Sequence, residues 1–69
     1  MLEKHSITLM GHKTSISIES EFWEELKQIA RVQNKSINEI ISSIDIGKNS
    51  GNLSSSIRIF IIQYLKGLI

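Results

Sequence analysis

The spacing of apolar residues changes from a period of two to a helical period near Ile18. Residues 13–18, Lys-Thr-Ser-Ile-Ser-Ile, alternate polar and apolar side chains, and this alternation is typical of a half-buried strand. Ile16 and Ile18 fall on one face of that strand. A shorter alternation occupies residues 6–9, and Gly11-His12 lies between the two segments. The pattern predicts one well-defined strand near the N-terminus and a second extended segment before it.

Three amphipathic helices are predicted after the strand, because apolar residues then recur at spacings of three and four. Ser20 is placed to cap the first helix, and Asn34 to end it in a left-handed conformation. Ser36 and Glu39 form a capping box for the second helix, and Ser54 is placed to cap the third. The apolar stripes are Phe22, Leu26, Ile29 and Ala30; Ile37, Ile40, Ile41 and Ile44; and Ile57, Phe60, Ile61, Tyr64, Leu65 and Leu68, with Ile59, Ile62 and Ile69 on a second side of the third helix.

The expected fold is therefore mainly α with one N-terminal β-strand, in the order β-α-α-α. Residues 1–12 form an N-terminal arm or extra strand, and residues 13–46 form the core of strand and two helices. Residues 47–53 form a loop, and residues 54–69 form the C-terminal helix. We expect Ile16, Ile18, Phe22, Leu26, Ile29, Ile37, Ile40, Ile41 and Ile44 to make up a core that two copies share.

A lone strand leaves its backbone groups unpaired, and two partners are possible for it. One is the same strand of a second chain, antiparallel about a two-fold axis. The other is residues 6–10 of the same chain, through a type II′ turn at Gly11-His12 that sets Ile7 opposite Ile16. Both pairings can coexist, because a strand has two edges.

Composition narrows the function classes. The chain has 69 residues and no cysteine, so disulfides and cysteine zinc sites are excluded, and a homodimer is the expected source of extra stability. His5 and His12 alone cannot make a structural zinc site, and we expect neither a metal nor a cofactor. No P-loop, nucleophile elbow or dinucleotide loop is present, so an enzyme is not expected.

Hydropathy and charge complete the picture. The longest apolar run is residues 59–62, far below the roughly 20 residues of a membrane span, and the N-terminus lacks the apolar core of a signal peptide. We therefore expect a cytoplasmic protein without membrane contact. Residues 19–30 contain four glutamates and one lysine, whereas the flanking segments are each weakly basic. A modestly positive surface is expected outside the acidic segment.

Residues 13–45 resemble the ribbon-helix-helix proteins of the Arc/MetJ type. The resemblance lies in the strand at residues 13–18, the acidic helix start, the apolar stripe that follows it, the tight turn, and Ser36-Ile37-Asn38 at the start of the next helix. Residues 11–15, 21–23, 44–45 and 52–55 are similar to a bacterial subfamily of short members with a third helix. The resemblance implies an intertwined homodimer with an intermolecular two-stranded ribbon.

The resemblance also implies sequence-preferring binding of double-stranded DNA, in a bacterial transcriptional repressor or similar regulator located at the nucleoid. The ribbon of such a dimer enters the major groove, where base edges can be distinguished. The start of the second helix meets the phosphate backbone, since free N–H groups and the helix dipole attract anions. The base contacts are assigned to Lys13, Ser15 and Ser17, and the phosphate contacts to Lys35, Ser36, Ile37 and Asn38.

A protein–protein interaction module is the alternative. The same fold serves as the dimerisation part of antitoxins, in which an additional segment holds a partner. The apolar second side of helix 54–68 would be that segment in this chain. A higher oligomer built through the same helix is a further possibility.

Overall fold

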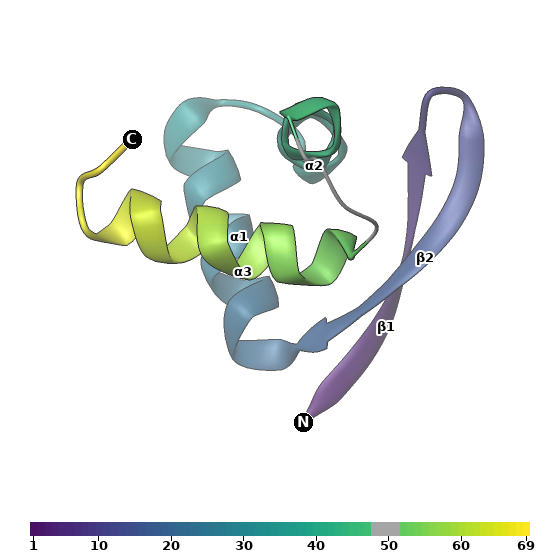
Figure 1. Ribbon diagram of the computed structural model, residues 1–69, viewed down its shortest axis with the longest axis horizontal. Coiled ribbons are helices and arrows are strands. Elements are labelled where there is room, and N and C mark those ends of the chain that lie inside the picture. Colours follow the sequence, from purple (N-terminus) through teal and green to yellow (C-terminus); the bar gives the residue numbers. More distant parts are fainter. Residues whose placement is uncertain (48–51) are drawn as a thin grey trace.

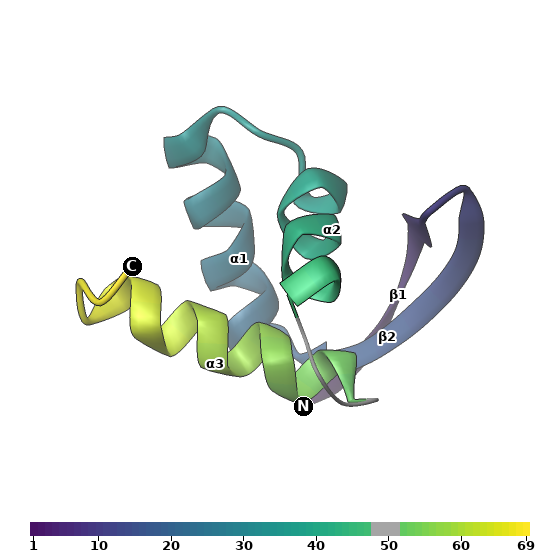
Figure 2. The same ribbon diagram turned by 45° about the horizontal axis from the view of Figure 1, so that its top comes forward.

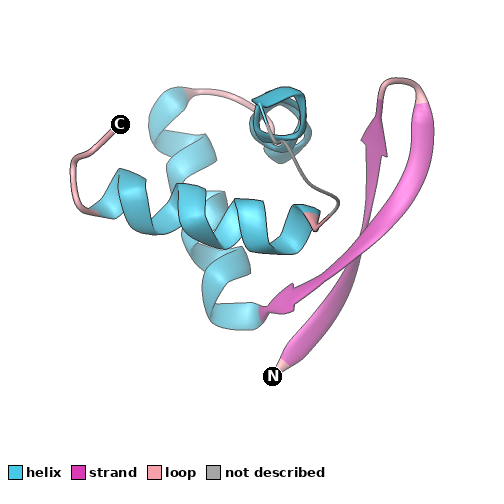
Figure 3. Cartoon of the chain, in the orientation of Figure 1, coloured by secondary structure: helices cyan, strands magenta, loops and turns pink. Residues whose placement is uncertain are grey.

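The computed structural model describes residues 1–47 and 52–69, and it places a two-stranded hairpin against three helices (Figures 1 and 3). The elements are β1 (Leu2–Leu9), β2 (His12–Glu19), α1 (Ser20–Gln33), α2 (Ile37–Gly47) and α3 (Leu53–Leu65). The predicted order of one strand and three helices is present from β2 onward. Residues 1–12 were predicted to form either an arm or an extra strand, and β1 is that extra strand. Most of the predicted loop, residues 48–51, lies outside the described residues. In the part of the chain that the structure describes, no helix combines the length and hydrophobicity needed to cross a membrane.

The hairpin turns at Met10-Gly11, one residue earlier than the sequence suggested. Both residues have positive φ, 53° for Met10 and 80° for Gly11, which is typical of a type I′ turn. Ile7 therefore lies opposite Thr14, and Ile16 lies opposite His5. The predicted turn at Gly11-His12 and the pairing of Ile7 with Ile16 are wrong, because Met10 adopts the left-handed conformation that was assumed to need glycine.

The register decides which backbone groups of the hairpin are already bonded. Hydrogen-bonded and non-hydrogen-bonded pairs alternate along an antiparallel ladder, and the Ser20 N–H donates to the Met1 carbonyl at 3.0 Å. Counting back from that pair, residues 12, 14, 16 and 18 direct their N–H and C=O groups toward β1. Lys13, Ser15 and Ser17 direct theirs to the outer edge of β2. One edge of β2 is therefore paired with β1, whereas the outer edge pairs with no strand among the described residues.

The hydrophobic core draws on every helix and strand of the chain. Each element contributes buried side chains, and α2 lies between α1 and the hairpin while α3 crosses both helices (Figure 2). Of the nine predicted core residues, Phe22, Ile37 and Ile44 are only partly buried and the other six are buried. The buried set is Ile7, Ile16, Ile18, Leu26, Ile29, Ala30, Ile40, Ile41, Ile57 and Ile61. β1 and α3 thus provide buried residues, Ile7, Ile57 and Ile61, that the predicted core did not include.

The helix ends follow the sequence signals with two exceptions. Asn34 ends α1 with φ of 57°, and the Ser36–Glu39 capping box is formed by two hydrogen bonds of 2.9 and 3.0 Å, as predicted. However, Ser20 is the first residue of α1 and not its cap. In α3, the side chain of Asn52 accepts the capping hydrogen bond from the Ser55 N–H, so the predicted Ser54 cap is wrong by two residues.

Instead of capping its helix, Ser54 attaches α3 to β2. Its hydroxyl donates to the Ser17 carbonyl at 2.8 Å, and one turn further along the helix the Arg58 Nε donates to the Glu19 carboxylate at 2.8 Å. The hydrogen bond from Arg58 holds the pKa of Glu19 below its usual value. Arg58 therefore pairs with the acidic end of β2.

Replacing Met10 with Asn should stabilise the protein. A side chain larger than glycine is disfavoured at positive φ, whereas Asn tolerates this conformation well. We expect a gain of about 0.5–1 kcal/mol, or roughly 2–8 °C in Tm at fixed protein concentration. The matched substitution Gly11→Ala should lower Tm, because Gly11 also has positive φ although a Cβ there meets no neighbour within 4 Å. Thermal unfolding by circular dichroism measures both, and a lower Tm for Met10→Asn would contradict the turn assignment.

Replacing Arg58 with Met should destabilise the protein in a pH-dependent way. Since folding lowers the pKa of Glu19, its contribution is fully present above the unfolded value of about 4.3 and is lost as pH falls through the folded value. The wild type should therefore unfold at a higher urea concentration than Arg58→Met at pH 7, with the difference shrinking toward pH 3. A difference that stays constant or grows on acidification would argue against the ion pair.

Candidate nucleic-acid interface

The hairpin exposes one polar face that combines residues of both strands. On β2 this face holds Lys13, Ser15 and Ser17, the predicted base contacts, and all three are exposed. Because paired residues share a face, β1 adds the residues opposite them. Lys4 pairs with Ser17, Ser6 with Ser15, and Thr8 with Lys13. We call these six exposed residues, Lys4, Ser6, Thr8, Lys13, Ser15 and Ser17, the hairpin face.

The hairpin face carries two unpaired positive charges. Neither Lys4 nor Lys13 forms an ion pair with any residue in the described ranges. Glu19 has the same strand parity at the end of β2, but its charge is paired with Arg58. Short hydroxyl side chains separate the lysines, so the surface is low and allows close approach. Such a face can bind a polyanion, with the lysines contacting its charges and the hydroxyls contacting hydrogen-bonding groups between those charges.

The start of α2 has two backbone N–H groups available for an anion. The Ser36 N–H is already bonded to the Glu39 carboxylate, and the Glu39 N–H is bonded to the Ser36 hydroxyl. No acceptor within residues 1–47 and 52–69 binds the N–H groups of Ile37 and Asn38. Ile37 can contribute only this N–H, since its side chain packs against the core. The donors at the predicted phosphate contacts are thus these two N–H groups, the side-chain NH2 of Asn38, the Ser36 hydroxyl and the Lys35 ammonium.

Glu39 places a negative charge at the start of α2. The hydrogen bonds from Ser36 hold its pKa below the usual value, so the carboxylate is charged at neutral pH. An anion bound at the helix N-terminus would be close to this negative charge. Lys35 lies next to the capping box and contributes to lowering the pKa of Glu39. Lys35 is exposed and is placed to offset Glu39 toward an incoming phosphate.

Asn38, near the start of α2, contacts the hairpin. Its side-chain carbonyl accepts a long hydrogen bond of 3.4 Å from the Thr8 N–H on the outer edge of β1. Asn38 and Lys13 also line one surface hollow of about 220 Å³, together with residues 6–8. The structure therefore joins one predicted phosphate contact to one predicted base contact. Lys35 and Ser36 are not part of this hollow.

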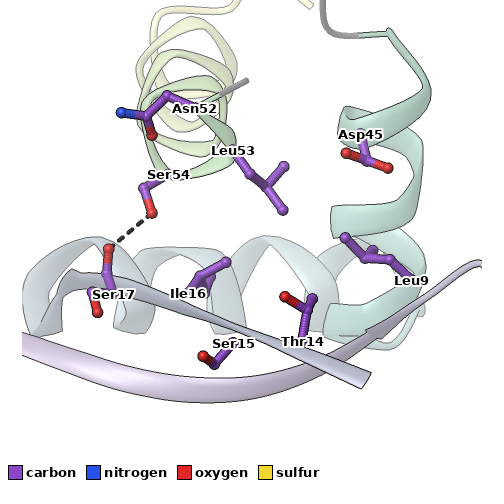
Figure 4. Close-up of a pocket in the computed structure, with 9 residues that line it drawn as sticks. All are labelled: Leu9, Thr14, Ser15, Ile16, Ser17, Asp45, Asn52, Leu53 and Ser54. Carbon is purple, nitrogen blue, oxygen red and sulfur yellow. Dashed lines mark hydrogen bonds between the residues drawn. The ribbon is translucent and has the colours of Figure 1, made fainter. Parts of the chain in front are cut away.

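A second hollow, of about 510 Å³, follows β2. Four consecutive strand residues, 14–17, line it, and since neighbouring residues point to opposite faces the hollow reaches the edge of the strand. The apolar side chains of Leu9, Ile16 and Leu53 line it, and polar groups come from α2 and from the start of α3 (Figure 4). The Ser54–Ser17 hydrogen bond lies at one end (Figure 4). Space remains beside the unpaired edge of β2.

Trp23 and His5 pack against each other. The rings of His5 and Trp23 stack with centroids 3.7 Å apart, and His5 Nε2 also lies 3.2 Å from the Glu3 carboxylate. Trp23 is partly buried and packs against the core. No group of three or more His, Asp or Glu side chains that could hold a metal occurs in the part of the chain covered by the structure.

Sequence reasoning missed the contribution of β1 to the hairpin face. Residues 6–9 alternate visibly, but Lys4 lies in a stretch where Leu2 points to the polar face and Glu3 and His5 to the core side. No alternation of apolar residues marks that stretch as a strand. The available signal was the hairpin alternative itself, because extending its pairing from residues 6–10 toward the N-terminus makes residue 4 part of the first strand. The predicted register would set Lys4 opposite Glu19, whereas the observed register sets it opposite Ser17.

Comparison with known families agrees with the fold. The profile of the ribbon-helix-helix domain matches residues 2–65, nearly the whole chain and including β1. The resemblance inferred from the strand and helix starts is thereby confirmed. Members of this family generally bind DNA and dimerise. No curated protein and no solved structure matches the chain significantly.

Proposed function

We propose that this chain, which belongs to the ribbon-helix-helix family, binds double-stranded DNA with sequence preference as a homodimer and acts as a bacterial transcriptional repressor. The observation that carries the proposal is the outer edge of β2. Within residues 1–47 and 52–69, no group bonds the outward N–H and C=O groups of Lys13 and Ser15, and the exposed side chains of the same two residues belong to the hairpin face. One strand thus provides a surface for a second copy and a surface for DNA.

Dimerisation pairs the outer edges of two β2 strands. The unpaired N–H and C=O groups of an edge strand favour addition of another strand. The hollow along residues 14–17 gives the incoming strand room, and its apolar side chains can bury those of the second copy. Ser17 already accepts from Ser54, but a carbonyl oxygen has a second lone pair. The result is a four-stranded sheet in the order β1-β2-β2-β1 with β2 of each copy at its centre.

The two central strands then present Lys13, Ser15 and Ser17 of both copies side by side. A two-stranded ribbon fits the major groove, where each base pair has its own pattern of donors and acceptors. The lysine ammonium donates to the acceptors of guanine, and the serine hydroxyls donate or accept and therefore discriminate less. Ordered water can extend the reach of the short serines.

Phosphate contacts at the start of α2 fix the register of the ribbon on the duplex. The candidate donors are the N–H groups of Ile37 and Asn38, the Ser36 hydroxyl and the Lys35 side chain. Asn38 also accepts a hydrogen bond from Thr8 of β1. Such contacts set position and orientation without reading sequence. A dimer held in this way over a promoter excludes other proteins from the groove, which is the simplest route to repression. Such a protein would be found at the nucleoid, in the cytoplasm.

The second candidate function is binding of a protein partner through α3. Ile57 and Ile61 are buried, but the second apolar side remains open, with Ile59 exposed to 56% and Ile62 to 44%. Leu65 and Leu68, expected on the buried stripe, are exposed as well. An exposed apolar helix face is typical of an interaction site. A stoichiometric partner recovered with the protein, together with no retention of DNA, would favour this antitoxin-like function.

Proline scanning of the two hairpin edges tests the dimer. Ser15→Pro removes an outward N–H from β2 without touching the hydrogen bonds to β1, and proline is tolerated at such edge positions. We expect it to convert the dimer to a monomer in sedimentation equilibrium. Ser6→Pro is the matched control, because Ser6 lies directly opposite on β1 with its N–H on the other edge. It should remain a dimer.

Circular dichroism confirms that both proline variants keep the hairpin and helices. A dimeric Ser15→Pro protein would contradict pairing of the β2 edges. A monomeric Ser6→Pro protein would instead place the interface on β1.

Lys13→Ala tests the DNA contact. In vitro selection from a random DNA pool first defines the preferred site at a stated salt concentration. Since each dimer loses two base-facing ammonium groups, affinity for that site should fall by about tenfold or more, while affinity for scrambled DNA falls less. The dimer should be unaffected, because Lys13 is exposed. Unchanged affinity in a gel-shift titration at low salt would count against docking of the ribbon in the groove.

A further inference from the structure

We propose that β1 forms the rim of the DNA-binding surface, with Lys4, Ser6 and Thr8 contacting the phosphate backbone along the walls of the major groove. This inference rests on the proposed function, since it concerns the same face of the same dimer. It assigns a role to a strand that lies outside the predicted strand-helix-helix core. The three residues are exposed and share the hairpin face with Lys13, Ser15 and Ser17.

The width of the sheet separates the roles of the two strands. Adjacent strands are about 4.8 Å apart, so the two β1 strands of a β1-β2-β2-β1 sheet lie about 14 Å from each other. The major groove is only about 12 Å wide. The two central strands can enter it, but the outer strands cannot follow to the groove floor. They come to rest over the groove walls, where the phosphates are.

The chemistry of β1 suits phosphate rather than bases. Lys4 has no ion-pair partner within the described chain, and an ammonium on a long flexible stem neutralises a phosphate without demanding one geometry. Ser6 and Thr8 provide hydroxyl donors, which commonly contact phosphate oxygens. No carboxylate lies between these residues on the hairpin face, since Glu3 points to the other side and binds His5.

The position of α2 supports the same arrangement. Asn38 binds the outer edge of β1 at Thr8, so the start of α2 lies on the far side of β1 from the centre of the dimer. The two free N–H groups at that helix start therefore extend the line of donors beyond β1. The base-reading residues of β2 lie nearest the dimer axis. Lys4, Ser6 and Thr8 lie outside them, and Lys35 and the start of α2 lie farthest out. The rim is continuous with the helix that the family resemblance assigns to phosphate.

Salt-dependent binding of Lys4→Ala tests the assignment. A phosphate contact changes affinity equally for all sequences, so Lys4→Ala should weaken binding to the selected site and to a scrambled duplex by the same factor, on the order of tenfold at 0.1 M salt. The slope of log K against log salt should become shallower by about 1.8, or about 0.9 for each of two copies. Lys66→Ala is the charge-matched control. Lys66 directly follows α3, at the end of that helix away from the hairpin (Figure 1), and its loss should change neither affinity nor slope.

The possible results separate the inference from the proposed function. If the wild type binds its selected site and Lys4→Ala has the same affinity and slope, the rim assignment is overturned while the proposed function stands. If Lys4→Ala alters the preferred sequence, β1 reads bases and the rim assignment is also overturned. If the wild type retains no duplex from the pool, the proposed function fails and the rim assignment fails with it. Sedimentation of the variants confirms that each remains folded and dimeric.

Discussion

The alternation of hydrogen-bonded pairs in the hairpin determines which backbone groups and side chains of β2 face outward. The turn at Met10-Gly11 sets the register, and the register sends the backbone groups of residues 12, 14, 16 and 18 toward β1. The same register leaves Lys13 and Ser15 with outward backbone groups. Because side chains alternate with the same period, the residues with free backbone groups are also those on the polar face. Lys13 and Ser15 of β2 therefore provide both the backbone groups for pairing with a second copy and the side chains that we propose to face DNA.

The buried core includes β1 and α3, which the predicted shared core did not include. A chain of 69 residues was expected to complete its core with a second copy. Instead, Ile7 of β1 and Ile57 and Ile61 of α3 are buried against the rest of the chain. Ser54 and Arg58 hold α3 on β2 by two hydrogen bonds of 2.8 Å. The dimer that we propose adds strand pairing along the outer edge of β2 to this core.

Local signals predicted the helical half of the structure well. The stripe of Leu26, Ile29 and Ala30 is buried, Asn34 ends α1, and the capping box at Ser36 is formed, because each feature depends on residues at most a few positions apart. The cap of α3 was misplaced because four polar residues, Asn52 and Ser54–Ser56, can all act as caps in that short stretch. Of these, Asn52 accepts from the Ser55 N–H, whereas the Ser54 hydroxyl donates to the Ser17 carbonyl.

The hairpin was harder to predict because its register depends on pairing across the chain. Gly11 suits either position of a two-residue turn, and only the conformation of Met10 places it second. A shift of one residue changes every cross-strand partner, which is why Ile7 meets Thr14 and not Ile16. For the candidate site, β2 and the start of α2 were identified from sequence, whereas Lys4 emerged only from the pairing of β1. Their actual contacts with DNA stay predictions.

Amide hydrogen exchange, measured by NMR at a concentration where the chain is dimeric, tests the central claim most directly. Ser15 and Ser6 lie opposite each other in the hairpin, and each directs its N–H to an outer edge. Pairing of the β2 edges predicts slow exchange for the Ser15 amide and fast exchange for the Ser6 amide, with Ser15 losing its protection on dilution. Fast exchange of Ser15 in the dimer would contradict the account.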